Sequence, residues 1–150
     1  MSNDDLMSEI DSLLSKEKER QAAAAESARQ WTETREQFTQ EFLRTWEGTI
    51  RPAMEAVRDR LSQNGVRCEI DGPGDRKREG PQYENEVAIR IYGRHMGDLT
   101  FCPEQSMDVT VGRSTPDGRT IADKVKVEVI TPSFVDDALR ELLRTVYPTE

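Results

Sequence analysis

Residues 1–47 read MSNDDLMSEIDSLLSKEKERQAAAAESARQWTETREQFTQEFLRTWE. The segment contains neither glycine nor proline, the two residues that most disfavour a helix interior. It is rich in Ala, Glu, Gln, Arg and Leu, which favour helix. All nine glycines and all seven prolines of the chain lie from Gly48 onward. We therefore expect one long helix from about Asp4 to Trp46, with Asn3 or Asp4 as its N-cap.

Apolar side chains on this helix recur in alternating steps of three and four, the spacing of a coiled-coil seam. The seam positions are Ile10, Leu14, Ala24, Ala28, Trp31, Phe38 and Phe42. Leu6 and Leu13 widen the first part of the seam, and the polar run 16–21 interrupts it. The pattern predicts two apolar patches, at residues 6–14 and 31–46, joined by a solvated rod.

The expected helix is too long to lie wholly on one small domain. About 43 helical residues span roughly 65 Å, whereas a domain of 100 residues has a radius of gyration near 13 Å. We expect residues 1–30 to form a projecting helical arm and residues 31–150 a single domain. Isolated helices need tertiary support in water. Self-association or docking to another protein would provide it, and a frayed tail is the alternative. The arm residues predicted to bind a partner are Leu6, Ile10, Leu13 and Leu14.

A second helix is expected over residues 50–64. Thr49 would be its N-cap after a break at residues 47–49, and Pro52 would lie in its first turn, where the missing N–H costs little. A continuous helix kinked near Pro52 is the alternative. Asn64 and the glycine after it end the helix.

Alternation with a period of two follows between residues 66 and 130. Five runs each place apolar residues on one face and polar residues on the other. The last of these runs has Val125, Val127 and Val129 on its apolar face. Strands with one apolar and one polar face indicate an antiparallel sheet that is covered on one side only.

The final element is a helix over residues 133–147. Pro132 near its first position and a capping box of Ser133 with Asp136 mark its start. The predicted fold class is α+β: a long N-terminal helix, a second helix, a five-stranded antiparallel sheet with one face covered by helices, and a C-terminal helix. The helix segment 31–47 belongs to the compact domain.

Catalytic motifs are absent from the sequence. There is one histidine, His95, in the turn that follows Tyr92, and no nucleophile elbow, P-loop or dinucleotide-binding fingerprint. An exposed turn histidine is the favoured interpretation. An enzyme that uses His95 with Asp98 or Tyr92 is the least favoured alternative function.

The two cysteines do not suggest a metal site or a disulfide. Cys68 shares its strand face with Val66 and Ile70, whereas Cys102 alternates with Phe101. Thiols on opposite faces of a sheet cannot share a tetrahedral metal or approach within disulfide distance. We expect Cys68 to act as a small buried apolar residue, and we expect no cofactor.

The loop at residues 72–81 holds the longest basic run, Arg76, Lys77 and Arg78, between glycines and prolines. A solvated hairpin loop is the simplest interpretation. A contact with a partner, or with the phosphates of a nucleic acid, is the alternative. The polar face of the sheet mixes both signs of charge, which predicts cross-strand pairing. Its charged residues are Arg67, Arg90, Lys124, Lys126, Glu69, Glu86, Asp108 and Glu128.

Charge and length limit the classes of function. The chain has 150 residues and a net charge of −8, of which −5 lies in residues 1–47. This acidity disfavours binding to nucleic acid or to anionic membranes. There is no apolar run long enough to cross a bilayer, and the acidic start lacks the pattern of a secretory signal, so we expect a cytoplasmic protein.

The sequence favours a non-catalytic interaction protein: an adaptor, an assembly factor or a chaperone-like subunit. It would form a homo-oligomer or join a larger complex through the N-terminal helix. In size, acidity and one-sided sheet the chain resembles dimeric α/β secretion chaperones in outline. Those chaperones place a helix between strands, and this sequence predicts none there. Fold likeness alone does not establish function.

Overall fold

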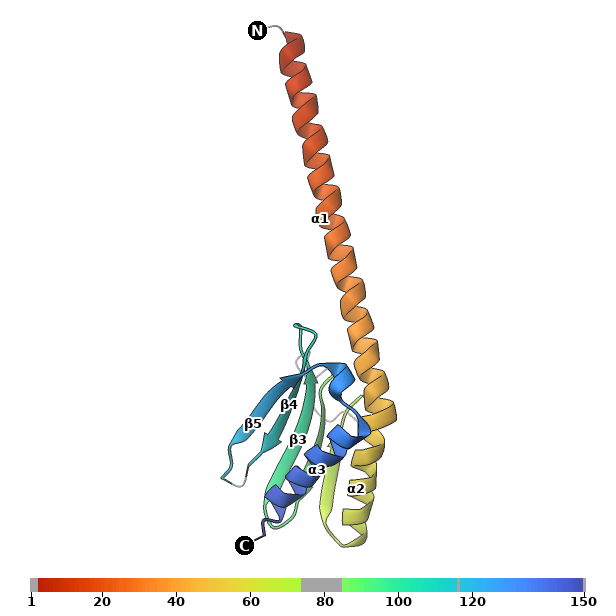
Figure 1. Ribbon diagram of the computed structural model, residues 1–150, viewed down its shortest axis with the longest axis vertical. Helices are drawn as coiled ribbons and strands as arrows, with labels where there is room; N and C mark the ends of the chain where they lie inside the picture. The colour runs from red at the N-terminus through yellow and green to blue at the C-terminus, as the bar shows by residue number, and fades with distance from the viewer. Residues whose placement is uncertain (1–2, 74–84, 116, 150) are drawn as a thin grey trace. The chain divides into compact units, whose positions relative to one another are not determined.

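A computed structural model describes residues 3–73, 85–115 and 117–149 (Figure 1). The chain consists of two compact units, Met1–Gln37 and Phe38–Glu150. In the first unit, every described residue is helical and exposed. The second unit contains the sheet and the buried core, and its architecture is the predicted α+β class. The predicted boundary after residue 30 stays a prediction. None of the described helices combines the length and the apolar composition needed to span a membrane.

The helical region continues further than expected. Thr49 is not an N-cap and the predicted break is wrong, because one wide π-helical turn joins the two helices. The N–H of Arg51 donates to the carbonyl of Trp46, five residues earlier. A proline has no N–H to donate and its ring clashes with the carbonyl four residues before it, so the wide turn lies directly before Pro52. The elements are α1 (Asn3–Thr45), the π-helical turn η1 (Trp46–Ile50) and α2 (Arg51–Gln63).

This wide turn also aligns the core residues of the helical region. Phe42, Trp46, Ile50 and Met54 are fully buried and follow one another at steps of four. An α-helix has 3.6 residues per turn, so a strict step of four drifts around its surface. The wider turn takes up the surplus, and all four side chains belong to one core cluster.

Five strands form one antiparallel sheet in the order β1-β2-β3-β4-β5, so every strand pairs with its neighbour in sequence. The pairing register places Ile70 next to Ile89, and Ile89 next to Leu99, on one face. Ile89 and Leu99 are fully buried. The strands are β1 (Arg67–Asp71), β2 (Val87–Tyr92), β3 (Met96–Pro103), β4 (Val109–Ser114) and β5 (Thr120–Val125).

Helices cover the apolar face of this sheet, as predicted. α2 packs against β1, and α3 (Pro132–Val146) packs against β3. α3 contributes Val135, Leu139, Leu142 and Val146 to the core. The core therefore lies between this helical layer and one face of the sheet, and the other face is open.

The last strand differs from the prediction. β5 ends at Val125, and Val127–Val129 forms a short 3-10 helix (η3) where a strand was expected. In a strand, Val127 and Val129 would share a face, but Val127 is buried and Val129 is exposed. Val127 and Ile130, three residues apart, both enter the core, and the N–H of Ile130 donates to the Val127 carbonyl at 3.1 Å. The tight turn therefore replaces the strand because it buries two side chains while leading the chain to α3.

The start of α3 also differs in detail. Pro132 occupies the first turn as expected, but the N-cap is Thr131, whose side chain accepts a hydrogen bond from the Phe134 N–H at 3.2 Å. The predicted capping box of Ser133 with Asp136 is therefore wrong. Proline at the first helical position fixes the cap at the residue before it.

Candidate functional site

An apolar stripe lies near the start of α1. Its five large side chains fall within about 120° of the helix circumference, and all are exposed to solvent. Their exposed fractions are 46% for Leu6, 54% for Met7, 39% for Ile10, 59% for Leu13 and 55% for Leu14. We call these five residues the arm stripe. Ser8, Ser12 and Ser15 lie on the opposite side of the helix.

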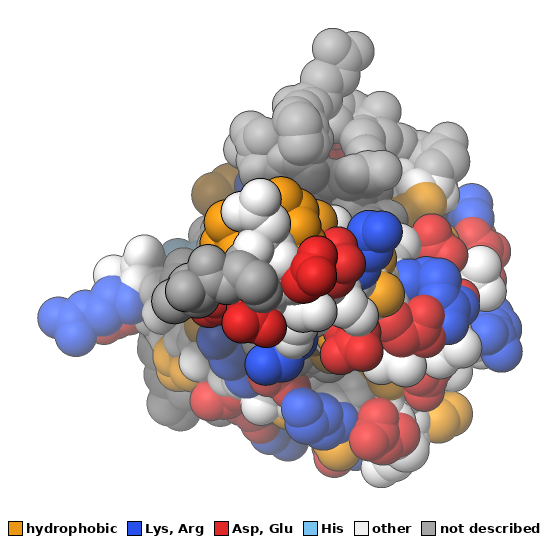
Figure 2. Space-filling model, turned by 90° about the horizontal axis from the view of Figure 1, so that it is seen from above, with side chains coloured by type: hydrophobic (Ala, Val, Ile, Leu, Met, Phe, Trp, Pro, Cys, Tyr) orange, Lys and Arg blue, Asp and Glu red, His pale blue; other side chains and the backbone are white. Residues whose placement is uncertain are grey.

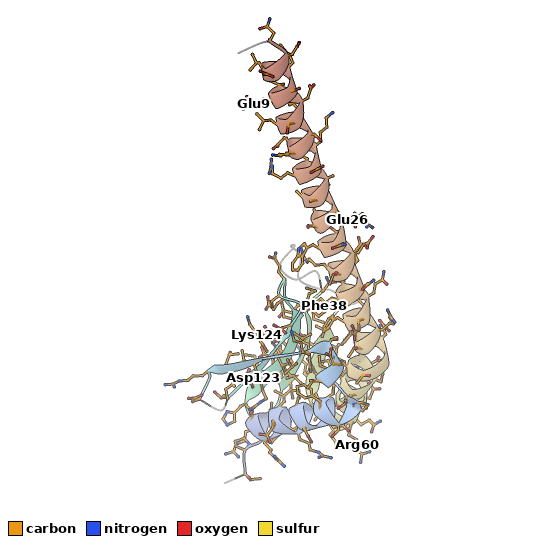
Figure 3. The ribbon with its side chains drawn as sticks, turned by 45° about the horizontal axis from the view of Figure 1, so that its top comes forward. Glu9, Glu26, Phe38, Arg60, Asp123 and Lys124 are labelled. Carbon is orange, nitrogen blue, oxygen red and sulfur yellow. The ribbon has the colours of Figure 1, made fainter. Side chains whose placement is uncertain are left out.

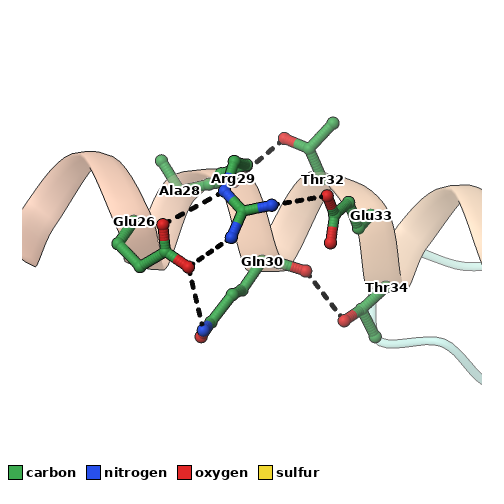
Figure 4. A network of polar contacts seen from close by, with 7 residues as sticks. All are labelled: Glu26, Ala28, Arg29, Gln30, Thr32, Glu33 and Thr34. Carbon is green, nitrogen blue, oxygen red and sulfur yellow. Dashed lines mark hydrogen bonds and ion pairs between the residues drawn. The ribbon is translucent and has the colours of Figure 1, made fainter.

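Local ion pairs support the helix that presents this stripe. Arg29 lies between two carboxylates, with hydrogen bonds from its Nε to Glu26 at 3.1 Å and from its Nη1 to Glu33 at 2.8 Å (Figure 4). Arg20 contacts Glu17 one turn away at 2.5 Å. The hydrogen bonds from Arg29 and Arg20 hold the pKa of Glu26 and of Glu17 below its usual value. Side chains paired at three and four residues favour a helix without any buried core.

Four of the seven residues predicted to bind a partner are therefore brought together. Leu6, Ile10, Leu13 and Leu14 share the arm stripe. The other three, Arg76, Lys77 and Arg78, lie outside the described residues.

His95 lies in the turn between β2 and β3 and is exposed. Its backbone N–H donates to the Val146 carbonyl at 3.1 Å. Asp98 accepts a hydrogen bond from the Ser114 hydroxyl at 2.6 Å. Tyr92 donates to Glu69 at 3.4 Å. Within the described part of the chain, no hydrogen bond joins the His95 ring to Asp98 or Tyr92.

The two cysteines are free thiols, and both are half-buried. Cys68 packs against the core. Cys102 lies on the other face of the sheet, beside Thr110. Burial raises the pKa of each thiol to about 11, so the nucleophilic thiolate is a minor species at neutral pH. Among residues 3–73, 85–115 and 117–149, no group of three potential ligands is placed to hold a metal ion.

Charged side chains on the open face of the sheet pair with one another, both across strands, as predicted, and along one strand. Arg90 lies opposite Asp98 in the register and contacts its carboxylate at 3.5 Å. Arg67 contacts Glu69 and lies over the ring of Tyr92, 4.6 Å from its centroid. Seen from above, a different side of the molecule also mixes acidic and basic side chains (Figure 2). Pairing accounts for the open face of the sheet without a ligand.

Sequence reasoning missed a groove on the apolar side of the sheet. It lies between α3 and the strands β4 and β5, and its volume is about 330 Å³. Ile121 on β5 contributes to it and is 47% exposed. The signal for it in the sequence is the alternation of Ile121, Asp123 and Val125, whereas the predicted strand follows Val125, Val127 and Val129 and so misses the start of β5.

Comparison with protein-family models, with curated proteins and with solved structures finds no match for this chain. Function is therefore inferred from the geometry of the chain itself.

Proposed function

We propose that this chain is a non-catalytic protein-interaction module that self-associates through the arm stripe. An adaptor, an assembly factor or a chaperone-like subunit would use such an arm to build a homo-oligomer or a larger complex. The observation that supports this proposal is the exposure of the five stripe residues on one side of a helix that has no buried residue of its own between residues 3 and 37.

The size of the stripe explains why association would be favourable. Full burial of a Leu, Ile or Met side chain contributes about 1.5–3 kcal/mol. Five such side chains from each of two copies offset a large part of the entropy lost on association. A second helix with the same stripe is a complementary surface, because Met7, Ile10 and Leu14 follow one another at the three-and-four spacing that packs two helices side by side.

Sedimentation velocity on the full chain tests this proposal. The matched variants are Ile10→Glu with Leu13→Glu, inside the stripe, and Ser8→Glu with Ser12→Glu, on the opposite side. Both add two negative charges to the same turns of the helix. We expect the original chain and the serine variant to be oligomers at micromolar concentrations, and the stripe variant to be a monomer. Fluorescence of the buried Trp46, measured in a Trp31→Phe background, checks that the second unit stays folded in each variant.

Two outcomes would contradict the proposal. One is a monomeric original chain throughout the concentration range. The other is an equal loss of association in the serine variant, because added charge alone would then explain the effect.

A further inference from the structure

The groove beside α3 is apolar at its base. Leu99, Val111 and Ile121, from three adjacent strands, line it from the sheet, while Phe134 and Ala138 line it from the helix. Leu99 is fully buried, but the exposed fraction rises to 47% at Ile121 on the outermost strand. The groove is therefore closed toward the core and open toward β5.

Carboxylates dominate the charge of this groove. Asp123, Asp137 and Glu141 line it, together with one cation, Arg113. One nitrogen of that cation, Nη1, donates to the Thr145 hydroxyl at 3.1 Å, and the four charged side chains together give the groove a net charge of −2. Asp123 forms no ion pair with any described residue.

The other two carboxylates have partners that are easily exchanged. Asp137 contacts Arg140 at 3.5 Å and Glu141 contacts Arg144 at 2.6 Å, each one turn along α3. The side chains of both arginines are more than two-thirds exposed. Exposed pairs of this kind contribute about 0–1 kcal/mol. A cation that entered the groove would therefore meet carboxylates that are available to it.

β5 offers a backbone surface next to these side chains. It is the last strand in the sheet order, so its outer edge pairs with no other described strand. Residues Thr120–Lys124 are exposed and Val125 is half-buried. An open strand edge is a template for an added strand, whose alternate side chains then face the two sides of the sheet.

A second copy of β5 does not fit this edge in the registers that pair most of the strand. Two antiparallel strands related by a two-fold axis pair residues that face the same side of the sheet. In the register that sets Ile121 of one copy opposite Val125 of the other, the two Asp123 carboxylates face each other. The other register that pairs five residues of each strand sets Ile121 opposite Asp123. A shorter overlap centred on Ile121 pairs only three residues of each β5, and in it Asp123 would face a cation, Arg119, just before the strand. Like charges or mismatched residues directly opposite are destabilising.

The arm stripe of a second copy is also a poor occupant. Its leucines and isoleucine would fit an apolar groove. However, Glu9 and Asp11 flank the stripe on its two sides, and they would bring negative charge close to a groove lined by three carboxylates. A partner for this site therefore needs positive charge.

We propose that the β5 edge and the adjacent groove bind an extended segment of another protein, in which a Lys or Arg has an apolar residue two positions away on each side. The basic side chain would lie opposite Asp123, and the two apolar side chains would lie opposite Ile121 and Val125, all facing the groove. Figure 3 labels Asp123 beside Lys124, which faces the other side of the sheet and favours an acidic residue opposite it.

This proposal is independent of the arm stripe, because the two surfaces belong to different units of the chain. Its test uses the full chain as bait and a display library of random nine-residue peptides as the probe. Enriched peptides are expected to share the pattern apolar–any–basic–any–apolar. The selection is repeated with Asp123→Lys and with the control Asp136→Lys, an exposed α3 residue that does not line the groove.

Charge reversal makes the result decisive. Asp123→Lys should weaken the selected basic peptides by about fivefold or more and should enrich peptides with Asp or Glu at the central position. Asp136→Lys should leave both the affinity and the pattern unchanged. Backbone amide resonances of β5 and α3 should shift on titration with the best peptide. The proposal is overturned if no peptide is enriched, if the enriched peptides ignore Asp123→Lys, or if the shifts lie elsewhere.

Discussion

The two units of this chain have different sources of stability. From residue 3 to residue 37 the helix has no buried side chain, and pairs such as Glu26 with Arg29 stabilise it locally. The unit from Phe38 onward instead encloses a core in which Trp46, Phe42 and Phe101 are fully buried. Where stability is local, apolar side chains stay exposed to solvent and are available to a partner.

Helix α1 contains both kinds of environment, solvent-exposed and buried. Within α1, Trp31 is 49% exposed, Phe38 is half-buried against the core and Phe42 is fully buried. These side chains are similar in size and hydrophobicity, and all three occupy predicted seam positions. The seam spacing therefore identifies a face of the helix, but it does not identify what covers that face.

Replacing one leucine in each unit tests the comparison most strongly. Leu99 is fully buried and Leu13 is 59% exposed. Leu99→Ala should lower the free energy of unfolding of the second unit by about 2–5 kcal/mol, because it leaves a cavity. Leu13→Ala should change it by less than about 0.5 kcal/mol. Urea unfolding followed by Trp46 fluorescence measures both, in a background where Trp31→Phe removes the exposed indole.

An equal loss of stability in the two alanine variants would break the comparison, since it would mean that the arm belongs to the cooperative core. The same samples should differ in the opposite sense in sedimentation. Leu13→Ala reduces the arm stripe and should weaken association, whereas Leu99→Ala should not.

Sequence periodicity predicted most of this fold because burial on one side produces it. The alternation in β2, with Val87, Ile89 and Ile91 on one face, reports directly which face is covered. The wide turn before Pro52 was not predictable in the same way. Gly48 and Pro52 are as consistent with a break in the helix as with a continuous helical region. Only the need to bury Trp46 and Ile50 together favours the continuous one.

The two candidate surfaces also differ in how far the sequence alone predicts them. The arm stripe follows from the spacing of Leu6, Ile10 and Leu13 along one helix, so local sequence contains the information. The groove depends on α3 covering β3 while leaving Ile121 exposed, and that depends on the sheet order. Asp123 in particular looks like any charged strand residue until the register places it beside Val111 on the apolar side.

Substituting alanine at either of two glycines should change the stability of the second unit by a smaller amount, and in opposite directions. An added Cβ at Gly97 would lie 2.9 Å from Val146 and 3.1 Å from Leu142, whereas at Gly48 it would meet nothing within 4 Å. Gly97→Ala should destabilise the second unit by about 1–3 kcal/mol through overpacking. Gly48→Ala should stabilise it by about 0.5–1 kcal/mol, because alanine costs less entropy in a helix. Thermal unfolding measures both, and a stabilising Gly97→Ala would show that α3 can move away from β3.

The smallest expected effect concerns the ion pairs of the arm. Arg29→Gln removes the pairs with Glu26 and Glu33, each of which adds slightly to helix stability. Arg35→Gln is the control, since Arg35 has no ion pair within the described chain. Secondary ¹³Cα chemical shifts of residues 26–33 should report lower helicity for Arg29→Gln alone.

The lowered pKa of Glu26 determines how this effect depends on pH. The pair stabilises the helix above the unfolded pKa of 4.5, and this contribution is lost as the pH falls through the pKa of the folded state. The difference between Arg29→Gln and the original chain should therefore be present at neutral pH and disappear in acid. A difference that persisted in acid would assign the effect to the helix propensity of glutamine, and the arm would then owe its helix to composition rather than to paired charges.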